Sequence, residues 1–547
     1  MTGDRSCDVP EADAGELAAA VVAWVRDAPS ARAVIDGEAV LSRGDLLRWA
    51  AATGDVLRAL ADPTGPSPEL CALVLPRSWA VPLGLIAARM AGLAFVLLDE
   101  AEAPPRLVAA LRTARPRLVV TTQAGSDPIA ALCGSAGLSA TGDFVVLTPP
   151  YPTLELLAVR RCGDARRLPP GTGHLVFTSG SGGRPKAVVL RDGPLLRTAA
   201  AQRALLGTDG SGTDAHAPSV WALSPGFDAS LSDVFCAILG SAPLLVCRGG
   251  QTRWRSLAAL IARHGAARAD LSPSLLRLLP PHALGLRAVI FGGERCDPDA
   301  AVRWGRMTLA LQAYGPTEAA VCATVARAGP AWRPGLLGRP LDHQIVLLAT
   351  QVGVFRVVPR HDTTPDDEVR FNATSLVSLG DGPEPPDGEV QGEIWLAGDA
   401  VAIGYLDAPE EEEAARFGLH QGVRVHRTGD VARWSDGLLA WLGRADRQFK
   451  LHGRRVVPEE IEAVAARVWG AACACVAIDG RLVLAMAARD DPAIAAEEAL
   501  TAIARALGPA LRPRGAVTLA PWPTLANGKT DLSAVTVEAR RLAGSGT

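Results

Sequence analysis

Apolar residues along the chain recur with two different periods, and the two periods alternate. Short runs in which every residue is apolar, such as Cys71–Leu75 and Ala94–Leu98, are typical of buried strands. Between these two runs, the apolar residues from Val81 to Ala91 recur at helical spacing. A strand, a helix and a second strand in this order form a β-α-β unit, which predicts a parallel sheet covered by helices.

The same alternation continues through most of the chain, so we predict an α/β fold. An alanine-rich amphipathic run begins at Leu17 and precedes a strand and turn at Ala33–Gly37. After the predicted strand Leu118–Val120, a loose segment rich in Gly, Ser and Ala is expected to extend to Thr141. The other predicted helices are Leu46–Leu60, Arg106–Ala114, Leu195–Leu206, Leu231–Leu239 and Leu257–His264, and the other predicted strands are Leu118–Val120, Phe144–Leu147, Leu244–Val246 and Ala288–Phe291.

Two segments depart from this rhythm. Gln351–Gly388 is dense in Pro, Gly and acidic residues and predicts a long surface excursion. Beyond Arg444 the pattern predicts a short charged hairpin and then a compact α+β tail. We therefore predict a boundary at Asp446, with a large N-terminal domain of helix-covered sheets at residues 1–445 and a small α+β domain at residues 446–547. In the tail, the predicted helices are Glu459–Trp469 and Ile494–Leu507, and the predicted strands are Ala474–Ala477 and Arg481–Met486.

Charge and hydropathy argue against several classes of protein. The 547 residues include 55 basic and 58 acidic ones, a net charge of -3, so no basic face for nucleic acid is indicated and the partner is expected to be small. The longest apolar stretch, Trp79–Met90, is interrupted by Pro82 and is too short to cross a membrane. The polar N-terminus has no apolar signal core, so we expect a cytoplasmic protein. Cys473 and Cys475, the close pair among ten cysteines, are interpreted as core residues of a strand.

The stretch from Thr178 to Lys186 has the composition of a phosphate-binding loop. It lies between two apolar runs, Leu175–Phe177 and Val188–Leu190, which predict flanking strands and a hairpin-like clasp. Glycines let several N–H groups turn toward one anion, hydroxyls add donors, and the lysine adds a charge. Pro185 before the lysine distinguishes this clasp from the common ATPase loop, and a mobile surface loop is the alternative for this segment alone. The residues of the clasp are Thr178, Ser179, Gly180, Ser181, Gly182, Gly183 and Lys186.

Four further motifs follow the clasp in order. Ala313–Glu318 combines a ring, a turn, a hydroxyl and a carboxylate, which suit a base, a phosphate oxygen and Mg²⁺. His426–Asp430 places a carboxylate after a tight turn, where it is a good acceptor for ribose hydroxyls. Trp441–Asp446 supplies a ring and a cation, and Leu525–Lys529 places a lysine after an Asn-Gly turn. Each residue taken alone is simpler to explain as a solvated carboxylate, a core ring or a surface cation, so the hypothesis depends on their joint order.

With its motifs in this order, the sequence from Leu41 to Asp531 resembles the adenylate-forming superfamily, and within it the amino-acid adenylation domains of nonribosomal peptide synthetases. The resemblance implies that an amino acid reacts with ATP, in the presence of Mg²⁺, to give an aminoacyl-AMP and pyrophosphate. It also implies that the small C-terminal domain is mobile, rotates at a hinge at Asp446, and closes an active site between the two domains.

The resemblance implies a role for each residue of the motifs. The clasp would wrap the β and γ phosphates, with Lys186 beside them. Tyr314 and Trp441 would flank adenine, and Arg444 would lie near the ribose and the hinge. Lys529 would bridge the substrate carboxylate and the α-phosphate, where negative charge gathers. The remaining implied roles are a phosphate contact for Thr317, Mg²⁺ binding for Glu318 and ribose binding for Asp430.

The choice of acid depends on Asp228, within Phe227–Ser230. In the amino-acid enzymes of the family this aspartate binds the substrate's ammonium group, so the resemblance implies an amino acid. An enclosed carboxylate is costly without a cation or a donor, so Asp270 favours a basic or β-amino acid. The alternative is that Asp270 bonds Ser232 or a water and merely lines the site. The pocket positions matched by the resemblance are Ala229, Ser232, Asp270, Val289, Phe291, Ala313, Val321 and Cys322.

Departures from the family pattern keep alternatives open. Gly182 stands where threonine is usual and Ala187 where glycine is usual, so one phosphate-contacting hydroxyl is missing. A catalytically degenerate member that acts as a binding partner, and an acyl- or aryl-CoA ligase of the same fold, are therefore alternatives. The sequence shows no phosphopantetheine attachment site, so we expect a free-standing, monomeric enzyme that loads the thiol of a separate phosphopantetheinyl carrier protein. The need for an MbtH-like helper protein is left open.

Overall fold

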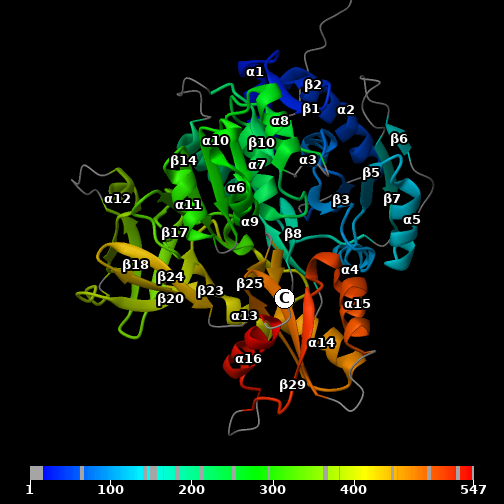
Figure 1. Ribbon diagram of the computed structural model, residues 1–547. Coiled ribbons are helices and arrows are strands. Elements are labelled where there is room, and N and C mark those ends of the chain that lie inside the picture. The colour runs from blue at the N-terminus through cyan, green and yellow to red at the C-terminus, as the bar shows by residue number, and fades with distance from the viewer. Residues whose placement is uncertain are drawn as a thin grey trace, which may run out of the picture.

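The computed structural model describes residues 16–61, 67–139, 145–147, 157–163, 165–178, 185–207, 215–248, 254–293, 296–360, 367–380, 382–444, 449–451, 454–488, 495–524 and 530–544. Three large sheets with their covering helices form the body of the molecule, and a smaller C-terminal unit lies beside them (Figure 1). This is the predicted α/β arrangement of a large N-terminal and a small C-terminal part. Within the described ranges, no helix has both the length and the apolar character needed to cross a membrane.

The first sheet has a parallel centre, as its β-α-β pattern predicts. β3 (Leu70–Leu75) pairs in parallel with β4 (Ala94–Asp99) and β5 (Leu118–Thr122), and all of its residues are buried. α3 (Ala80–Met90) connects β3 to β4. The continuous apolar runs follow from this burial on both faces of the sheet. The other strands are β6 (Val145–Leu147), β7 (Leu157–Arg161), β8 (His174–Thr178), β9 (Lys186–Leu190) and β21 (Gly404–Tyr405), and the helices beside them are α4 (Pro104–Ala114) and α5 (Ser126–Ser135).

The second sheet carries the strands whose carboxyl ends face the candidate site. β10 (Ser219–Trp221), β12 (Arg268–Leu271), β13 (Ala288–Gly292) and β14 (Leu309–Tyr314) are neighbours and run parallel. Side chains on these strands alternate between two faces, so α6 (Asp192–Leu206) covers one set and α8 (Trp254–His264) and α11 (Pro298–Gly305) cover the other. The remaining elements are α1 (Glu16–Asp27), β1 (Arg32–Asp36), β2 (Ala39–Ser42), α2 (Arg43–Ala61), β11 (Leu244–Val246), α9 (Pro273–Leu278), α10 (Pro281–Leu284), β15 (Thr324–Ala328) and β16 (Arg339–Pro340).

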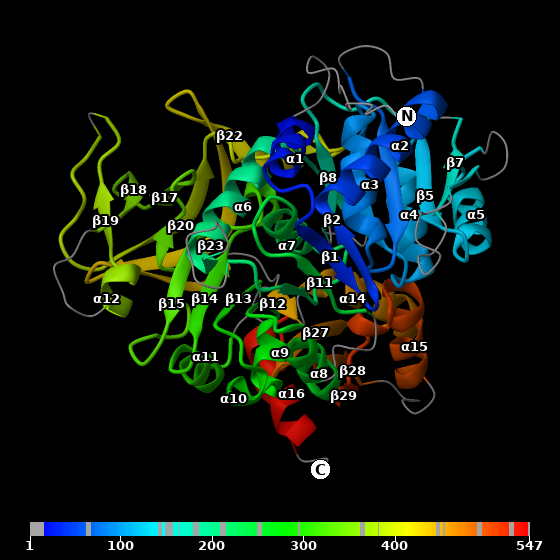
Figure 2. The same cartoon turned by 90° about the horizontal axis from the view of Figure 1, so that it is seen from above.

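Helix α7 (Asp228–Ile238) packs with α3 between the first two sheets (Figure 2). Its side chains Val234, Phe235 and Ile238 are buried in the same core cluster as the sheet residue Leu73. A helix buried on this many sides has no freedom to shift, so its first residue, Asp228, is held in place by the core.

The third sheet corrects one prediction. The segment 351–388, expected to be a surface excursion, contributes β18 (Val354–Pro359) and β19 (Thr374–Val377) to this seven-stranded sheet, with α12 (Asp367–Asn372) between them. Phe355, Val357 and Leu376 point into its core, and the surrounding Pro and acidic residues hid this alternation. The loose segment expected up to Thr141 was also wrong in part, because it contains α5. The other elements of the third sheet are β17 (Ile345–Ala349), β20 (Val390–Ala397), α13 (Glu410–Arg416), β22 (Phe417–His420), β23 (Val423–Ser435) and β24 (Leu438–Arg444).

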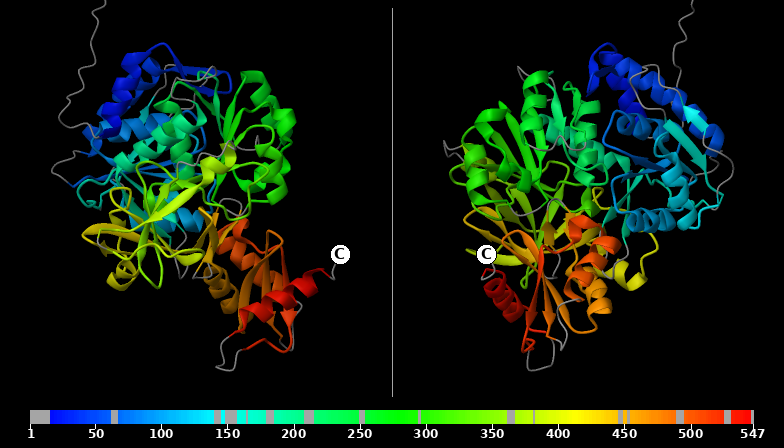
Figure 3. Two further views of the ribbon diagram at one scale, coloured as in Figure 1. Left: turned by 90° about the vertical axis from the view of Figure 1, so that its left-hand side faces the viewer. Right: turned by 45° about the vertical axis from the view of Figure 1, so that its right-hand side comes forward.

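The C-terminal unit has its own core, and its predicted helices and strands are present (Figure 3). Trp469 and Ile503 are buried within this core, and Cys475 packs there as expected for a core residue. The backbone oxygen of Leu507 accepts a 3.5 Å hydrogen bond from Arg106 of α4, which joins the unit to the first sheet. Asp446, the expected hinge, lies outside the described residues. The elements of the unit are β25 (Phe449–Leu451), β26 (Arg454–Val456), α14 (Pro458–Trp469), β27 (Cys473–Ile478), β28 (Arg481–Ala487), α15 (Ala495–Leu507), β29 (Gly515–Leu519) and α16 (Leu532–Gly544).

Candidate active site

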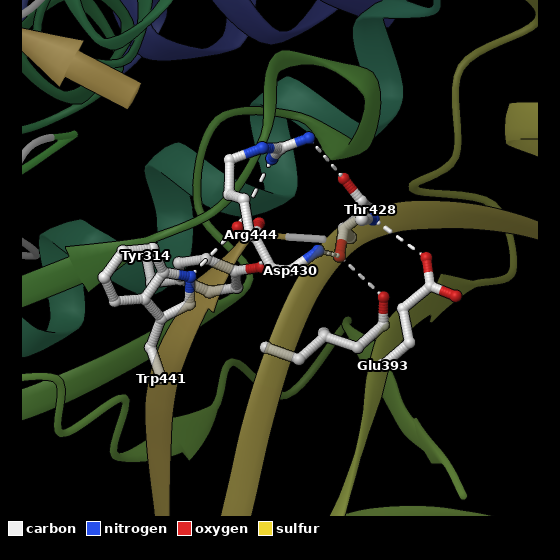
Figure 4. Close-up of polar contacts among 8 residues, drawn as sticks. Tyr314, Glu393, Thr428, Asp430, Trp441 and Arg444 are labelled. Carbon is white, nitrogen blue, oxygen red and sulfur yellow. Dashed lines mark hydrogen bonds and ion pairs between the residues drawn. The ribbon is translucent and has the colours of Figure 1, made fainter. Parts of the chain in front are cut away.

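The carboxylate of Asp430, on β23, is surrounded by donors from the adjacent strand β24 and from β14 of the second sheet (Figure 4). The Tyr314 hydroxyl donates to its Oδ2 over 2.8 Å, and the Trp441 indole N–H donates to its Oδ1 over 2.9 Å. Arg444 lies 3.3 Å from the same Oδ1. Burial and the facing Asp430 carboxylate raise the pKa of Tyr314 well above its ordinary value, so the phenol stays protonated and keeps donating. Sequence analysis placed these four residues around the nucleoside, and the structure brings them together.

The turn before Asp430 is fixed by Thr428, which lies within the predicted motif, and by Glu393, which no motif indicated. Thr428 donates to Ile394 O over 2.7 Å and accepts from the Asp430 N–H over 2.9 Å. Glu393, on β20, accepts a 2.9 Å hydrogen bond from the Gly429 N–H (Figure 4). Gly429 has a φ of 75°, and a Cβ there would lie 2.6 Å from an Arg416 nitrogen. This position therefore requires glycine, and the turn aims the Asp430 carboxylate.

A second chain of contacts joins the clasp lysine to Glu318. Glu318 is 2% exposed and accepts a 2.7 Å hydrogen bond from the Tyr405 hydroxyl. The Tyr405 ring lies under the ammonium group of Lys186, which is 5.4 Å from the ring centroid. Lys186 also forms an ion pair with Glu412 of α13. The acidic start of α13 thus contacts the clasp lysine.

The clasp itself is described only at its two ends. β8 and β9 form the antiparallel pair that was predicted around it, with Thr178 opposite Lys186. The Oγ1 atom of Thr178 is buried and has no hydrogen-bond partner within the described part of the chain, as expected of a group that a ligand oxygen would satisfy. Ser179–Gly183 and Lys529 lie outside the described residues, so their roles stay predictions.

A cavity opens where α7 begins and where β12, β13 and β14 end, and five of the predicted pocket residues line it. Asp228 is 5% exposed; its Oδ1 accepts from the Ala229 N–H over 2.8 Å, and its Oδ2 accepts from the hydroxyl of Thr317. Thr317 was expected to contact a phosphate oxygen, but in the structure it faces the carboxylate expected to bind the amino group. The five lining residues are Asp228, Ala229, Asp270, Ala313 and Val321.

Two of the predicted pocket positions are wrong by one residue. Val289 and Phe291 point into the core beneath α8 and α11, on the far face of β13. Side chains alternate along a strand, so their neighbours Ile290 and Gly292 face the cavity side instead. Cys322 is buried in the cluster that contains Ile290, behind the cavity wall.

Ser232 contacts the pocket indirectly, through Gln202, a residue that was not predicted. Its hydroxyl donates to the side-chain oxygen of Gln202, on α6, and Gln202 lines the cavity. Gln202 and Tyr405 carried no motif, and only the fold brings them to the site. Asp233 was also missed as a residue near the pocket, although a charged residue that interrupts the apolar pattern of α7 can be seen in the sequence.

The model of the family described as AMP-binding enzyme matches residues 21–406. Because this is more than half of the chain, the protein belongs to the AMP-binding enzyme family.

Two curated relatives and one solved structure are similar over most of the chain. The probable non-canonical nonribosomal peptide synthetase CymA of Salinispora arenicola is 31% identical over 80% of this chain. The chain spans only 5% of CymA, but it spans 71% of novobiocin biosynthesis protein H of Streptomyces niveus, which is 30% identical over 84% of this chain. The Vibrio cholerae adenylation domain AlmE, solved with glycyl-adenosine-5'-phosphate, superposes with a TM-score of 0.75 at 18% identity, covering 100% of this chain and 99% of AlmE.

Proposed function

We propose that the protein is an ATP-dependent amino-acid ligase that forms an aminoacyl-AMP and then passes the acyl group to a carrier thiol. One observation carries the proposal: the short segment Tyr314–Glu318 contacts three groups at once. Tyr314 donates to Asp430, Thr317 donates to Asp228, and Glu318 accepts from Tyr405 below the clasp lysine. The expected sites for ribose, amino group and metal therefore meet along one stretch of chain.

In the proposed reaction, a carboxylate oxygen of the amino acid attacks the α-phosphorus of ATP, and the bond to the β-phosphate breaks to release pyrophosphate. Asp430 would accept hydrogen bonds from the ribose hydroxyls, exchanging some of its present donors for them. Lys186 and Thr178 would hold the departing phosphates, and Lys529 would stabilise the charge that develops between carboxylate and phosphate.

The residues present also fit a magnesium ion, provided that the phosphates supply most of its ligands. Glu318 offers one buried carboxylate, and the described residues contain no group of three or more His, Cys, Asp or Glu able to hold a metal. Magnesium typically binds through one or two carboxylates together with substrate phosphates and water. When bound, the ion would neutralise charge on the departing pyrophosphate.

An amino acid is favoured over a fatty or aryl acid by Asp228. This carboxylate is buried at the cavity beside its donors Ala229 and Thr317, and its negative charge favours a cationic ligand group, which a simple acyl chain lacks. The glycyl adenylate held by AlmE is a product of the same kind, and the names of CymA and novobiocin biosynthesis protein H support a place in natural-product biosynthesis. A separate carrier protein as acceptor, a domain boundary and hinge at Asp446, and cytoplasmic location complete the proposal.

Amino-acid-dependent exchange of labelled pyrophosphate into ATP tests the first half-reaction. We expect exchange with one group of amino acids and none with their deaminated acids. Asp228→Ala should abolish this preference, and Lys529→Ala should suppress exchange while ATP still binds. Loading of free coenzyme A in place of a carrier thiol would instead support a CoA ligase. Absence of exchange with every amino acid, in folded protein that binds ATP, would contradict the proposal.

A further inference from the structure

The acyl cavity does not end at Asp270. A second cavity, between α6, α7 and the second sheet, lies on the other side of this residue, and Asp270 and Gln202 line both. The second cavity is enclosed by Ser219, Cys236 and Ile290, and Asp233 of α7 faces it. Asp270 therefore stands between the pocket that contains Asp228 and a smaller space of about 10 Å³, which is lined by another carboxyl group.

Within the described part of the chain, no protein donor satisfies the Asp270 carboxyl group or the Oδ2 atom of Asp233. Asp270 is 9% exposed, and no hydrogen bond to its side chain is present among the described residues. The Oδ2 atom of Asp233 is fully buried and has no hydrogen-bond partner within the same residues. Of the two partners expected for Asp270 as a residue that merely lines the site, Ser232 is contradicted because its hydroxyl donates to Gln202, and a bound water is the other.

The nearby cation of the protein, Arg77, does not supply the missing hydrogen bonds to these carboxyl groups within the described residues. Arg77 is the positive charge that acts on Asp233, but its guanidinium donates to the backbone oxygens of Cys247, Ala222 and Leu223. Burial, with Asp228 nearby, raises the pKa of Asp270 to about 8. Burial and Asp270 together raise the pKa of Asp233 well above its ordinary value. Asp270 thus has no positive charge from the described part of the chain acting on it, and Asp233 has Arg77 as a nearby charge that donates its hydrogen bonds elsewhere, so a cationic ligand group could satisfy both.

We propose that the acyl pocket selects amino acids with a cationic side chain, whose α-ammonium group binds Asp228 and whose side-chain cation lies between Asp270 and Asp233. The proposal rests on the proposed function, since it names the side chain of the activated amino acid. An apolar side chain would leave two buried carboxyl groups unsatisfied, whereas an ammonium or guanidinium group supplies donors and charge to both.

The experiment compares L-lysine, L-ornithine and L-arginine with the neutral analogues norleucine, norvaline and citrulline, using the full-length protein. Pyrophosphate exchange gives kcat/KM for each, and calorimetry without ATP gives binding directly. We expect the basic amino acids to exceed their neutral analogues at least about tenfold, and Asp270→Asn and Asp233→Asn each to remove most of this difference. Asp299→Asn, an exposed carboxylate on α11, is the matched control and should leave the ratio unchanged.

Proton release provides a second readout that a merely structural role would not move. Since a carboxyl group of pKa about 8 is mostly protonated at pH 7, binding of a cation should release about one proton, measured as a buffer-dependent binding enthalpy. Asp270→Asn should reduce that release to the part contributed by Asp233, whose pKa is also raised. Equal or better binding and exchange by the neutral analogues would overturn the proposal while leaving amino-acid adenylation intact. Binding of basic amino acids without any exchange would instead support the pocket and contradict the proposed ligase activity.

Discussion

The hydroxyl of Thr317 donates a hydrogen bond to the carboxylate of Asp228, 89 positions earlier in the chain. Thr317 belongs to the segment that also supplies Tyr314 to the Asp430 cluster. The group expected to bind the amino end of the substrate is therefore oriented by the same segment that is expected to bind the nucleotide. This contact couples the two halves of the site, and it can be tested directly.

Thr317→Val should weaken amino-acid binding more than ATP binding. The valine keeps the shape of threonine but removes a donor to a buried carboxylate, and hydrogen bonds to charged groups contribute about 1.5–3 kcal/mol. We expect KM for the amino acid to rise roughly 10-fold to 100-fold, and Thr317→Ser, which keeps the hydroxyl, to stay near wild type. A larger change in the KM for ATP than in that for the amino acid would instead show that Thr317 acts mainly on phosphate.

Trp441→Phe tests a donor to Asp430 without removing the aromatic ring. The indole N–H lies 2.9 Å from Asp430 Oδ1, while Tyr314 and Arg444 donate to the same carboxylate and remain in the variant. We expect the KM for ATP to rise by about tenfold or less, because one of several charged hydrogen bonds is lost. If Trp441 acts only by flanking adenine, the phenylalanine ring will replace it with no change in nucleotide binding.

Glu412→Gln should improve ATP binding, because Glu412 pairs with the clasp lysine and would compete with a phosphate for it. Lys186 and Glu412 are both partly exposed, and ion pairs of this kind contribute about 0.2–1 kcal/mol. We expect the Kd for ATP, measured by calorimetry, to fall about twofold to fivefold, with Glu411→Gln as the exposed neighbouring control. A rise in this Kd would mean that Glu412 positions the lysine rather than competing for it.

The sequence was sufficient for the parts of the fold that depend on local pattern. β3, α3 and β4 agree with their predicted ranges within a residue or so, because continuous apolar runs and helical spacing are distinct signals. β18 was missed because its short apolar run, Val354–Pro359, is interrupted by Arg356 and lies within a segment rich in Pro and acid. Local composition therefore gave the wrong answer where long-range pairing decides.

The candidate site likewise contains residues that could be predicted from local motifs and residues that could not. Asp430, Tyr314 and Asp228 could be named in advance because each lies in a motif with a recognisable order. Val289 and Phe291 were misplaced because a shift of one residue along a strand exchanges its two faces, and sequence alone does not fix that register. Gln202 and Tyr405 come from elements far away in the chain, so their position at the site depends on packing that no local pattern encodes.

Asp270 should make the ligand-free protein less stable as the pH rises. Its pKa is raised from 3.8 to about 8 in the folded protein, so the folded state binds a proton that the unfolded state releases over this interval. Stability contributed by the protonated form is fully present below about pH 4 and is lost as the pH approaches 8.

The measurement is thermal unfolding of wild type and Asp270→Asn between pH 6 and pH 8.5. Because one pKa unit corresponds to about 1.4 kcal/mol, the wild type should lose at most about 3 kcal/mol more than the variant between pH 6 and pH 8. The pKa of Asp233 is also raised, so this residue likewise lowers the stability of both proteins as the pH rises. Without the charge at Asp270, the Asp233 pKa should be raised less in the variant, which increases the difference between the two pH profiles. If L-lysine is bound as proposed, it should reduce the wild-type loss, since a cation between the two carboxyl groups replaces the proton that each would otherwise need. Identical pH profiles for the two proteins would show that Asp270 is solvated or paired, and the argument for a cationic side chain would then fail with it.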